Sequence, residues 1–339
     1  MKILFHNIVK SINFDSRPYR DQNNEWVITA CNLSSTLGKS IEIGNISTMK
    51  KEDADVIVFI DYPRRNNEIL KYAKVHDVKK YLIAIECPII DNERSYSKDY
   101  HSIFEKVFTW SDDLVDSDPN KYIKINYAIL SKKSFNDIEY RKKNCIIMCG
   151  NKFNNAKNEL YTERLNCIKW FNENAPSDLD LYGPYWDLFF IESQNILAEV
   201  INRINIKLNL LKIRSLKNYK GTVEKKEDVL PLYNFSVCLE NAYGYRGYIT
   251  EKILDCLYCG TIPVYKGANN ITEYIPPTCF IDYDKFSSIS DLCEFMKNMS
   301  HEKVLSYQMD IKKFVESKEF IKFFPGTQAN IVLSSILSN

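Results

Sequence analysis

Continuous apolar runs that stop at proline or glycine recur along this chain. Residues 55–63 and 79–88 are two such runs, and between them apolar side chains from Ile69 to Val75 follow near-helical spacing. Similar apolar runs occupy residues 2–9, 145–150, 179–183, 231–241 and 261–267. Strands that are apolar along their whole length are typical of parallel sheets with both faces covered. The pattern therefore predicts an α/β fold made of strand-helix-strand units.

The α/β pattern stops and restarts near the middle of the chain. Residues 131–144 are charged and poor in large aliphatic side chains, and a new apolar strand follows them. A length of 339 residues also exceeds the usual size of one domain. We therefore expect an N-terminal domain over residues 1–143, a second domain over residues 144–320 and a closing helix over residues 321–339. The sequence does not indicate where that last helix packs.

The overall charge limits the partners that the chain can bind. It has 45 Lys and Arg against 44 Asp and Glu, a net charge of +1, so no global field attracts a polyanion and we expect no nucleic-acid partner. The ten cysteines lie mostly in apolar runs, which favours reduced thiols over disulfides. No apolar run approaches the ~18 residues that indicate a transmembrane helix, and the start lacks a signal-peptide pattern. We expect a cytoplasmic protein without a transmembrane segment.

A helix is predicted between the apolar runs at 231–241 and 261–267. Thr250 stands where an N-cap residue is expected, and Gly260 stands where a C′ glycine is expected. In a parallel strand-helix-strand unit the helix begins at the carboxyl edge of the sheet, where open α/β sheets bind ligands. The start of this helix is therefore a candidate ligand site.

Lys252 lies in the first turn of that helix, where the positive end of the helix dipole opposes a cation. A bound diphosphate would offset this repulsion, because Lys252 and the free N–H groups of the first turn would contact the phosphates. Glu251 would accept hydrogen bonds from ribose hydroxyls. The alternative is an exposed helix end, since the unfavourable term is only about 0.3–1 kcal/mol at a surface. The residues alone leave both interpretations open.

The segment FSVCLENAYGYRGYITEKILDCLYCGTIPVYKG, residues 235–267, resembles the signature of the α1,3-fucosyltransferase family (glycosyltransferase family 10). It contains the Phe, Glu-Asn, Tyr-x-Thr-Glu-Lys and Ile-Pro-x-x-x-Gly pattern. Weaker similarity covers residues 85–90, 104–115, 159–171 and 179–183. The resemblance implies a GT-B fold, in which two Rossmann-like domains face a cleft, with the acceptor bound mainly by the first and GDP-fucose by the second. It also implies inversion at the transferred sugar carbon, with no cofactor and no metal ion required.

The resemblance also assigns donor contacts to individual residues. Glu251 and Lys252 match ribose and phosphate ligands, and Asn241 and Tyr248 match residues that line the donor pocket. Arg164 matches a phosphate-binding arginine. Its alternative is a solvated surface charge, because it lies within a predicted amphipathic helix.

Two further charged residues complete the candidate site. Glu86 ends an apolar strand, so its carboxylate is expected at the carboxyl edge of the sheet, and it matches the base proposed for the family. A positioned carboxylate can take the proton of an acceptor hydroxyl during inverting glycosyl transfer. Arg246 lies in the donor loop, where a guanidinium could stabilise charge on the leaving diphosphate.

Other chemistries have less support in the sequence. The pairs Asp178/Asp180 and Asp282/Asp284 imitate the Asp-x-Asp of metal-dependent transferases, but neither stands next to a nucleotide motif. Dinucleotide-binding and P-loop glycine patterns are absent. We predict no metal site.

The function expected from these observations is transfer of fucose from GDP-fucose to a hydroxyl of a glycan acceptor, as an inverting α1,3-fucosyltransferase. One alternative is a GT-B transferase that uses another nucleotide sugar, because phosphate and ribose contacts do not specify the base or the hexose. The other is a noncatalytic protein that binds a nucleotide sugar or a glycan.

Overall fold

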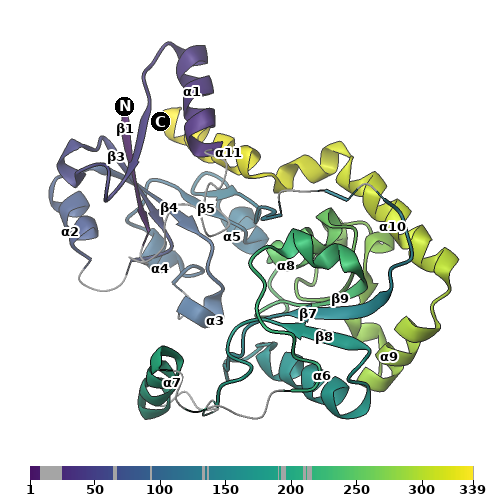
Figure 1. The fold of residues 1–339 in the computed structure, drawn as a ribbon. Coiled ribbons are helices and arrows are strands. Elements are labelled where there is room, and N and C mark those ends of the chain that lie inside the picture. Colours follow the sequence, from purple (N-terminus) through teal and green to yellow (C-terminus); the bar gives the residue numbers. More distant parts are fainter. Residues whose placement is uncertain are drawn as a thin grey trace. The chain divides into compact units, whose positions relative to one another are not determined.

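The computed structural model describes residues 1–7, 25–63, 67–91, 94–131, 134–135, 137–189, 191, 196–208, 211 and 216–338. The chain forms two compact units, each with its own parallel sheet (Figure 1). The first unit consists of Met1–Ile129, Arg246–Glu251 and Glu319–Asn339, and the second of Leu130–Tyr245 and Lys252–Lys318. The predicted α/β class is confirmed.

A six-stranded parallel sheet forms the centre of the first unit, with the strand order β2-β1-β3-β4-β5-β6. The strands are β1 (Lys2–Asn7), β2 (Glu42–Asn45), β3 (Val56–Ile60), β4 (Lys79–Ala84), β5 (Val107–Thr109) and β6 (Tyr122–Lys124). The helices between them are α1 (Glu25–Leu37), α2 (Glu68–Val75), α3 (Pro88–Asp91), α4 (Lys98–His101) and α5 (Asp112–Ser117). Every residue of β3 is buried, as its continuous apolar run predicts.

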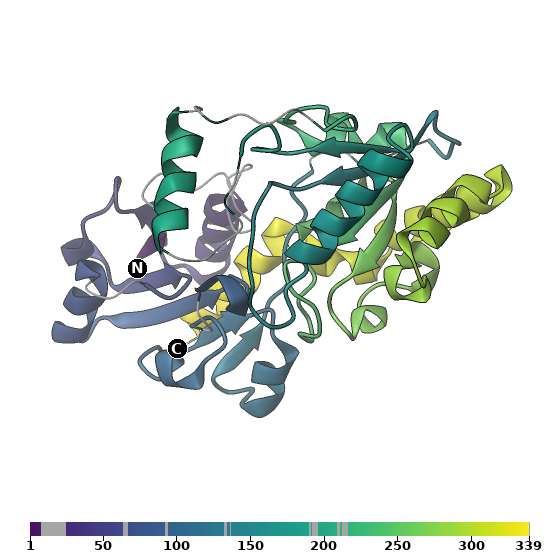
Figure 2. The same cartoon turned by 90° about the horizontal axis from the view of Figure 1, so that it is seen from below.

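The second unit contains a five-stranded parallel sheet with the order β11-β10-β9-β7-β8. Its strands are β7 (Lys143–Met148), β8 (Leu179–Tyr182), β9 (Tyr233–Leu239), β10 (Ile262–Lys266) and β11 (Ile281–Asp282). Its helices are α6 (Tyr161–Asn174), α7 (Ile196–Leu208), α8 (Glu251–Tyr258), α9 (Ile289–Asn298) and α10 (His301–Val315). Figure 2 shows the same elements from below.

The predicted strand-helix-strand unit is confirmed as β9, α8 and β10. All seven residues of β9 are buried, and β9 pairs with β7 on one side and with β10 on the other. Gly260 occupies the predicted C′ position after α8, with a φ of +70°, and its N–H donates to the carbonyl of Leu257 at 3.0 Å. The helix therefore begins at the carboxyl edge of this sheet.

The chain passes from the first unit to the second between Ile129 and Leu130. The N–H of Ile129 donates to the carbonyl of Phe323 at 3.0 Å, within the first unit. The next two N–H groups, of Leu130 and Ser131, donate to the buried carboxylate of Asp255 in the second unit, at 2.8 and 3.0 Å. The passage precedes the charged stretch that the sequence suggests as a boundary.

The C-terminal helix α11 (Pro325–Leu337) belongs to the first unit. It packs against α1, and the two helices lie side by side in Figure 1. The side chain of Gln328 on α11 accepts a hydrogen bond from the N–H of Asn126 at 2.9 Å. A closing helix is thus present, and it packs on α1 and on the segment that follows β6.

The helices of both units are short. Helix α10, the longest that the structure describes, has 15 residues, whereas a helix needs about 20 to cross a bilayer. Within the described ranges, no helix has both the length and the apolar character of a membrane span.

Candidate functional site

The predicted donor segment is divided between the two units. Asn241 belongs to the second unit, Arg246–Glu251 belong to the first, and the chain returns to the second at Lys252. Arg164 lies in the second unit and Glu86 in the first. The resemblance places the donor contacts mainly in the second domain, whereas in the structure each unit carries three of the six candidate donor residues.

Arg164 is buried in the second unit, with 5% of its surface exposed. Helix α6 presents it toward the carboxyl end of β9, where its guanidinium donates to the carbonyls of Leu239 and Glu240, both at 2.8 Å. The guanidinium also lies over the ring of Tyr161, 5.0 Å from its centroid. This burial excludes the alternative in which Arg164 is a solvated surface charge.

Lys252 has an internal partner of opposite charge. Its Nζ lies 3.1 Å from Oε2 of Glu240, whose side chain is fully buried, while the Lys252 side chain remains 20% exposed. Glu240 follows β9 directly, so the end of the strand brings a carboxylate to the start of α8. The anion that the sequence argument expects from a ligand is thus supplied in part by the chain itself.

Arg164 and Lys252 meet at one small cavity of about 20 Å³, which Lys226 also lines. The cavity lies at the carboxyl ends of β7 and β9, and its volume is enough for about one water molecule. Burial raises the pKa of the Cys149 thiol at this cavity to about 11, and the charges of Arg164 and Lys252 oppose that rise. The positive charges of Arg164 on α6 and Lys252 on α8, which are far apart in sequence, therefore both affect the Cys149 thiol.

Sequence reasoning identifies Asn241 but misses two charged neighbours of the cavity. The carbonyl of Asn241 accepts from the N–H of Leu160 at 3.0 Å, which fixes the chain just before α6. Glu240 could have been found, because it is the Glu of the Glu-Asn pair at the end of an apolar strand. Lys226 lies in a charged run without a motif, and only the fold brings its Nζ to 2.8 Å from Asp255.

In the first unit, Tyr248 is packed among aromatic side chains. It is 2% exposed, and its ring centroid lies 4.9 Å from that of Trp110 and 5.9 Å from that of Tyr127. Gly247 beside it has a φ of +81°, and a Cβ there would lie 2.3 Å from the carbonyl oxygen of Trp110. The predicted donor-pocket tyrosine therefore anchors its segment in the first unit.

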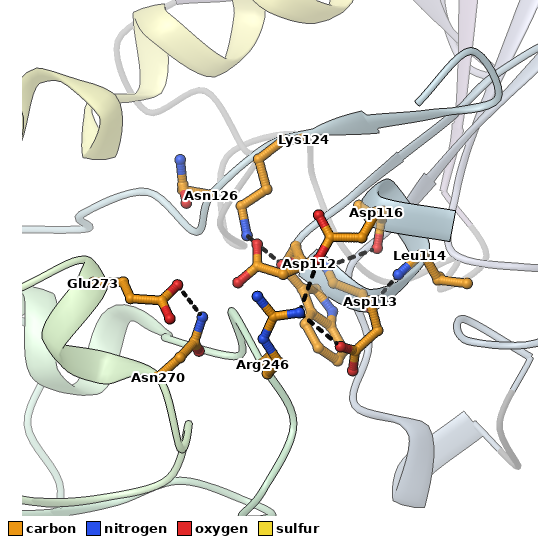
Figure 3. A network of polar contacts seen from close by, with 12 residues as sticks. Asp112, Asp113, Leu114, Asp116, Lys124, Asn126, Arg246, Asn270 and Glu273 are labelled. Atoms are coloured by element: carbon orange, nitrogen blue, oxygen red, sulfur yellow. Dashed lines mark hydrogen bonds and ion pairs between the residues drawn. The ribbon is translucent and has the colours of Figure 1, made fainter. Parts of the chain in front are cut away.

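Arg246 is held by carboxylates of α5 (Figure 3). Its guanidinium lies 3.2 Å from Asp113 and 2.8 Å from Asp116, and its carbonyl accepts from the N–H of Asp112 at 3.3 Å. The neighbouring carboxylate of Asp112 is paired with Lys124 at 2.6 Å. A role for Arg246 on a diphosphate would require its guanidinium to exchange or share these partners.

The structure brings Glu86 and Glu251 near the same phenol. Burial raises the pKa of Tyr127 well above its usual range, and the negative charges of Glu86 and Glu251 add to the shift. Glu86 follows β4 and is half-buried, with one carboxylate oxygen accepting from the N–H of Cys87 at 3.1 Å. The candidate base and the candidate ribose ligand thus both act on Tyr127 in the first unit.

The two Asp-x-Asp pairs have structural partners. Asp178 pairs with Lys297 at 3.1 Å, and Asp180 pairs with Lys143 at 3.0 Å. In the other pair, Asp282 accepts from the N–H of Asp284, which pairs with Lys266 at 2.7 Å. In the part of the chain that the structure describes, no three His, Cys, Asp or Glu side chains gather as metal ligands would.

Known fucosyltransferases resemble parts of this sequence. An alpha-(1,3)-fucosyltransferase (FucT) of Helicobacter pylori is 34% identical over 84 residues, which cover 24% of this chain and 17% of the relative. An alpha-(1,4)-fucosyltransferase of Arabidopsis thaliana is 35% identical over 72 residues, which cover 21% of this chain and 18% of the relative. The match thus spans less than a fifth of the length of either relative.

The fold has solved counterparts. The crystal structure of an alpha1,3-fucosyltransferase matches with a TM-score of 0.55 and 15% identity, covering 100% of this chain and 90% of that chain. Another, described as the enzyme with GDP-fucose, matches with a TM-score of 0.50 and 14% identity over the same shares. The similarity shows that the chain has a GT-B fold with two Rossmann-like units.

Part of the chain also matches a family model. Residues 194–320, which include α8 and its flanking strands, match "Glycosyltransferase family 10 (fucosyltransferase) C-term". The match includes five of the six candidate donor residues and the carboxylate of Glu240. Over these residues the chain is similar to the fucosyltransferases of glycosyltransferase family 10.

Proposed function

We propose that the protein transfers fucose from GDP-fucose to a hydroxyl of a glycan, as an inverting α1,3-fucosyltransferase. The observation that carries this proposal is the meeting of Arg164 and Lys252 at one cavity at the carboxyl ends of β7 and β9. Open α/β sheets bind ligands at this edge, and the two side chains suit a diphosphate. The family match, which includes β9 and Lys252, supports fucose as the sugar, and the similar solved structure with GDP-fucose supports GDP as the carrier.

In the proposed reaction, Glu86 acts on the acceptor, whereas Arg164, Lys252 and Glu251 act on the donor. The acceptor oxygen forms a bond to the anomeric carbon of fucose while the bond from that carbon to the diphosphate oxygen breaks, and GDP leaves with the bonding electrons. Glu86 takes the proton of the acceptor hydroxyl. Arg164 and Lys252 offset the charge that develops on the diphosphate, which fixed cations do without reorganising. Glu251 accepts hydrogen bonds from the ribose.

The test is a transfer assay on a glycan array, with GDP-fucose as donor and GDP-mannose and UDP-sugars as controls. We expect fucosylated products from GDP-fucose alone, with NMR of the product showing an α1,3 linkage. Transfer only from another nucleotide sugar would favour the alternative donor. GDP binding without a single turnover would favour a noncatalytic binding protein, and a 1,4-linked product would correct the linkage.

A further inference from the structure

Asp61 follows β3 directly and has a left-handed backbone, with a φ of +61°. This conformation costs glycine least, and aspartate adopts it less often, through local hydrogen bonds of its short side chain. Such residues persist only where the surrounding structure holds them, and they cluster at functional sites. The contacts of the Asp61 carboxylate indicate its role.

The carboxylate of Asp61 holds the peptide groups that lead into Glu86. Its Oδ1 accepts from the N–H of Ile85 at 2.9 Å and from the N–H of Glu86 at 2.8 Å. The N–H of Asp61 itself donates to the carbonyl of Ile83 at 2.9 Å. The backbone pairing of β3 with β4 ends at Ile60 and Ile83, so this side chain continues the connection beyond the end of the sheet.

The carbonyl side of the same segment is held as well. The hydroxyl of Ser95, which is fully buried, donates to the carbonyl of Glu86 at 2.7 Å. The carbonyl of Ile85 accepts from the indole N–H of Trp110 at 3.0 Å and from the hydroxyl of Tyr127. Donors and acceptors on both sides thus fix the backbone from which the Glu86 side chain projects.

We propose that Asp61 is a positioning residue for Glu86, fixing the end of β4 so that the Glu86 carboxylate is held where it takes the acceptor proton. This role rests on the proposed function. Asp61 acts through the two N–H groups and does not itself receive the proton. A small displacement of a reacting group can reduce a rate by about a hundredfold, so the expected effect is large.

The decisive variant is Asp61→Gly, because glycine accepts the left-handed backbone and removes only the carboxylate. We expect its melting temperature to stay within a few degrees of the unsubstituted protein and its GDP affinity to stay within about twofold. Its kcat for transfer should fall by about ten- to a hundredfold.

Asp61→Asn should recover part of the rate, since an amide oxygen can still accept from both N–H groups. The matched control is Asp77→Gly, at an exposed left-handed aspartate with a φ of +52°, which should leave kcat unchanged.

Combination with Glu86→Gln separates positioning from an independent role. If Asp61 acts through Glu86, Asp61→Gly should slow the Glu86→Gln variant by less than twofold. An undiminished kcat in Asp61→Gly, a full multiplicative loss in the double variant, or normal turnover of Glu86→Gln would each overturn the assignment. Absence of transfer by the unsubstituted protein would instead overturn the proposed function, and this role with it.

Discussion

At the scale of single residues, the candidate donor site is built from buried charges in opposite pairs. Lys252 pairs with Glu240, and Lys226 pairs with Asp255, and both carboxylates are fully buried. Each pair offsets part of the cost of removing its charges from water. Glu240 also counters the repulsion between Lys252 and the start of α8. A diphosphate bound at the start of α8 would meet a Lys252 side chain that Glu240 already holds in place.

Replacing Lys252 with alanine should weaken GDP binding. A charge-assisted contact to phosphate contributes about 1.5–3 kcal/mol, so we expect Lys252→Ala to raise the Kd for GDP by roughly 10- to 150-fold in calorimetry. Lys297→Ala is the matched control, because it breaks a surface lysine–aspartate pair of the same length in the same unit. An unchanged Kd for Lys252→Ala would contradict the phosphate assignment.

Lys252→Ala also removes the cation that lies 3.1 Å from the buried carboxylate of Glu240, which should lower the stability of the second unit. The double variant Lys252→Ala/Glu240→Gln removes the charge of this carboxylate as well. We expect it to regain most of the lost melting temperature while GDP binding stays weak. Recovery of both properties together would mean that the first variant acted only through misfolding.

The buried carboxyl of Asp91 makes a pH-dependent contribution to stability. Burial raises its pKa to about 7, against the opposing hydrogen bonds from Ser95, and one of its oxygens is buried without a hydrogen-bond partner among the described residues. A carboxyl whose pKa is raised in the folded state favours folding below its unfolded pKa, near 4, and loses that contribution as the pH rises to about 7.

We expect Asp91→Asn, which imitates the neutral carboxyl, to melt at a higher temperature than the unsubstituted protein at pH 8. The difference should shrink between pH 7 and pH 4, because the native carboxyl then becomes protonated. Asp118→Asn, at an exposed position of the same unit, is the control. A difference that does not vary with pH would mean that the substitution acts through packing.

At the scale of elements, the sequence predicts the strands that lie in apolar runs. These runs become β1, β3, β4, β7, β8, β9 and β10, whereas β2 and β6, with four and three residues, lie outside the runs that the sequence analysis identifies. The sequence also does not show that residues Arg246–Glu251 belong to the first unit, whereas the residues on either side belong to the second. This assignment depends on the packing of Tyr248 against Trp110 and Tyr127, which are distant in sequence.

Gly247 should be essential for the docking of this segment. Gly247→Ala would add a Cβ 2.3 Å from the carbonyl oxygen of Trp110, whereas Gly244→Ala, at a similar φ of +85°, would meet no atom within 4 Å. We expect Gly244→Ala to cost about 1–2 kcal/mol of unfolding free energy from backbone strain alone. Gly247→Ala should cost clearly more in urea unfolding and reduce transfer. Equal losses in the two variants would contradict the docking role.

At the scale of the whole molecule, the chain passes between its two units four times, at 129/130, 245/246, 251/252 and 318/319. Alternating strands and helices predict two α/β units, because each Rossmann-like unit repeats a local pattern. The sequence does not predict the last of these crossings, at 318/319, after which α11 packs against α1, because the apolar face of α11 would suit many partners. The same limit applies to the site: residue types indicate Arg164 and Lys252, but only the fold shows that they share a cavity.

The charge distribution of the molecule also bears on the need for a metal ion. With a net charge of +1, the protein offers a diphosphate no general attraction, so stabilisation of the leaving group must come from nearby charges. Under the proposed function, Arg164, Lys252 and the first turn of α8 supply the positive charge that a divalent ion supplies in metal-dependent transferases. We therefore expect transfer to continue in excess EDTA at a rate within about twofold of the untreated protein.

Modest stimulation by manganese would fit assisted release of GDP. Loss of transfer in EDTA, restored by one divalent cation, would contradict this account and direct attention to Asp178/Asp180 and Asp282/Asp284, whose lysine partners a metal ion would then have to displace.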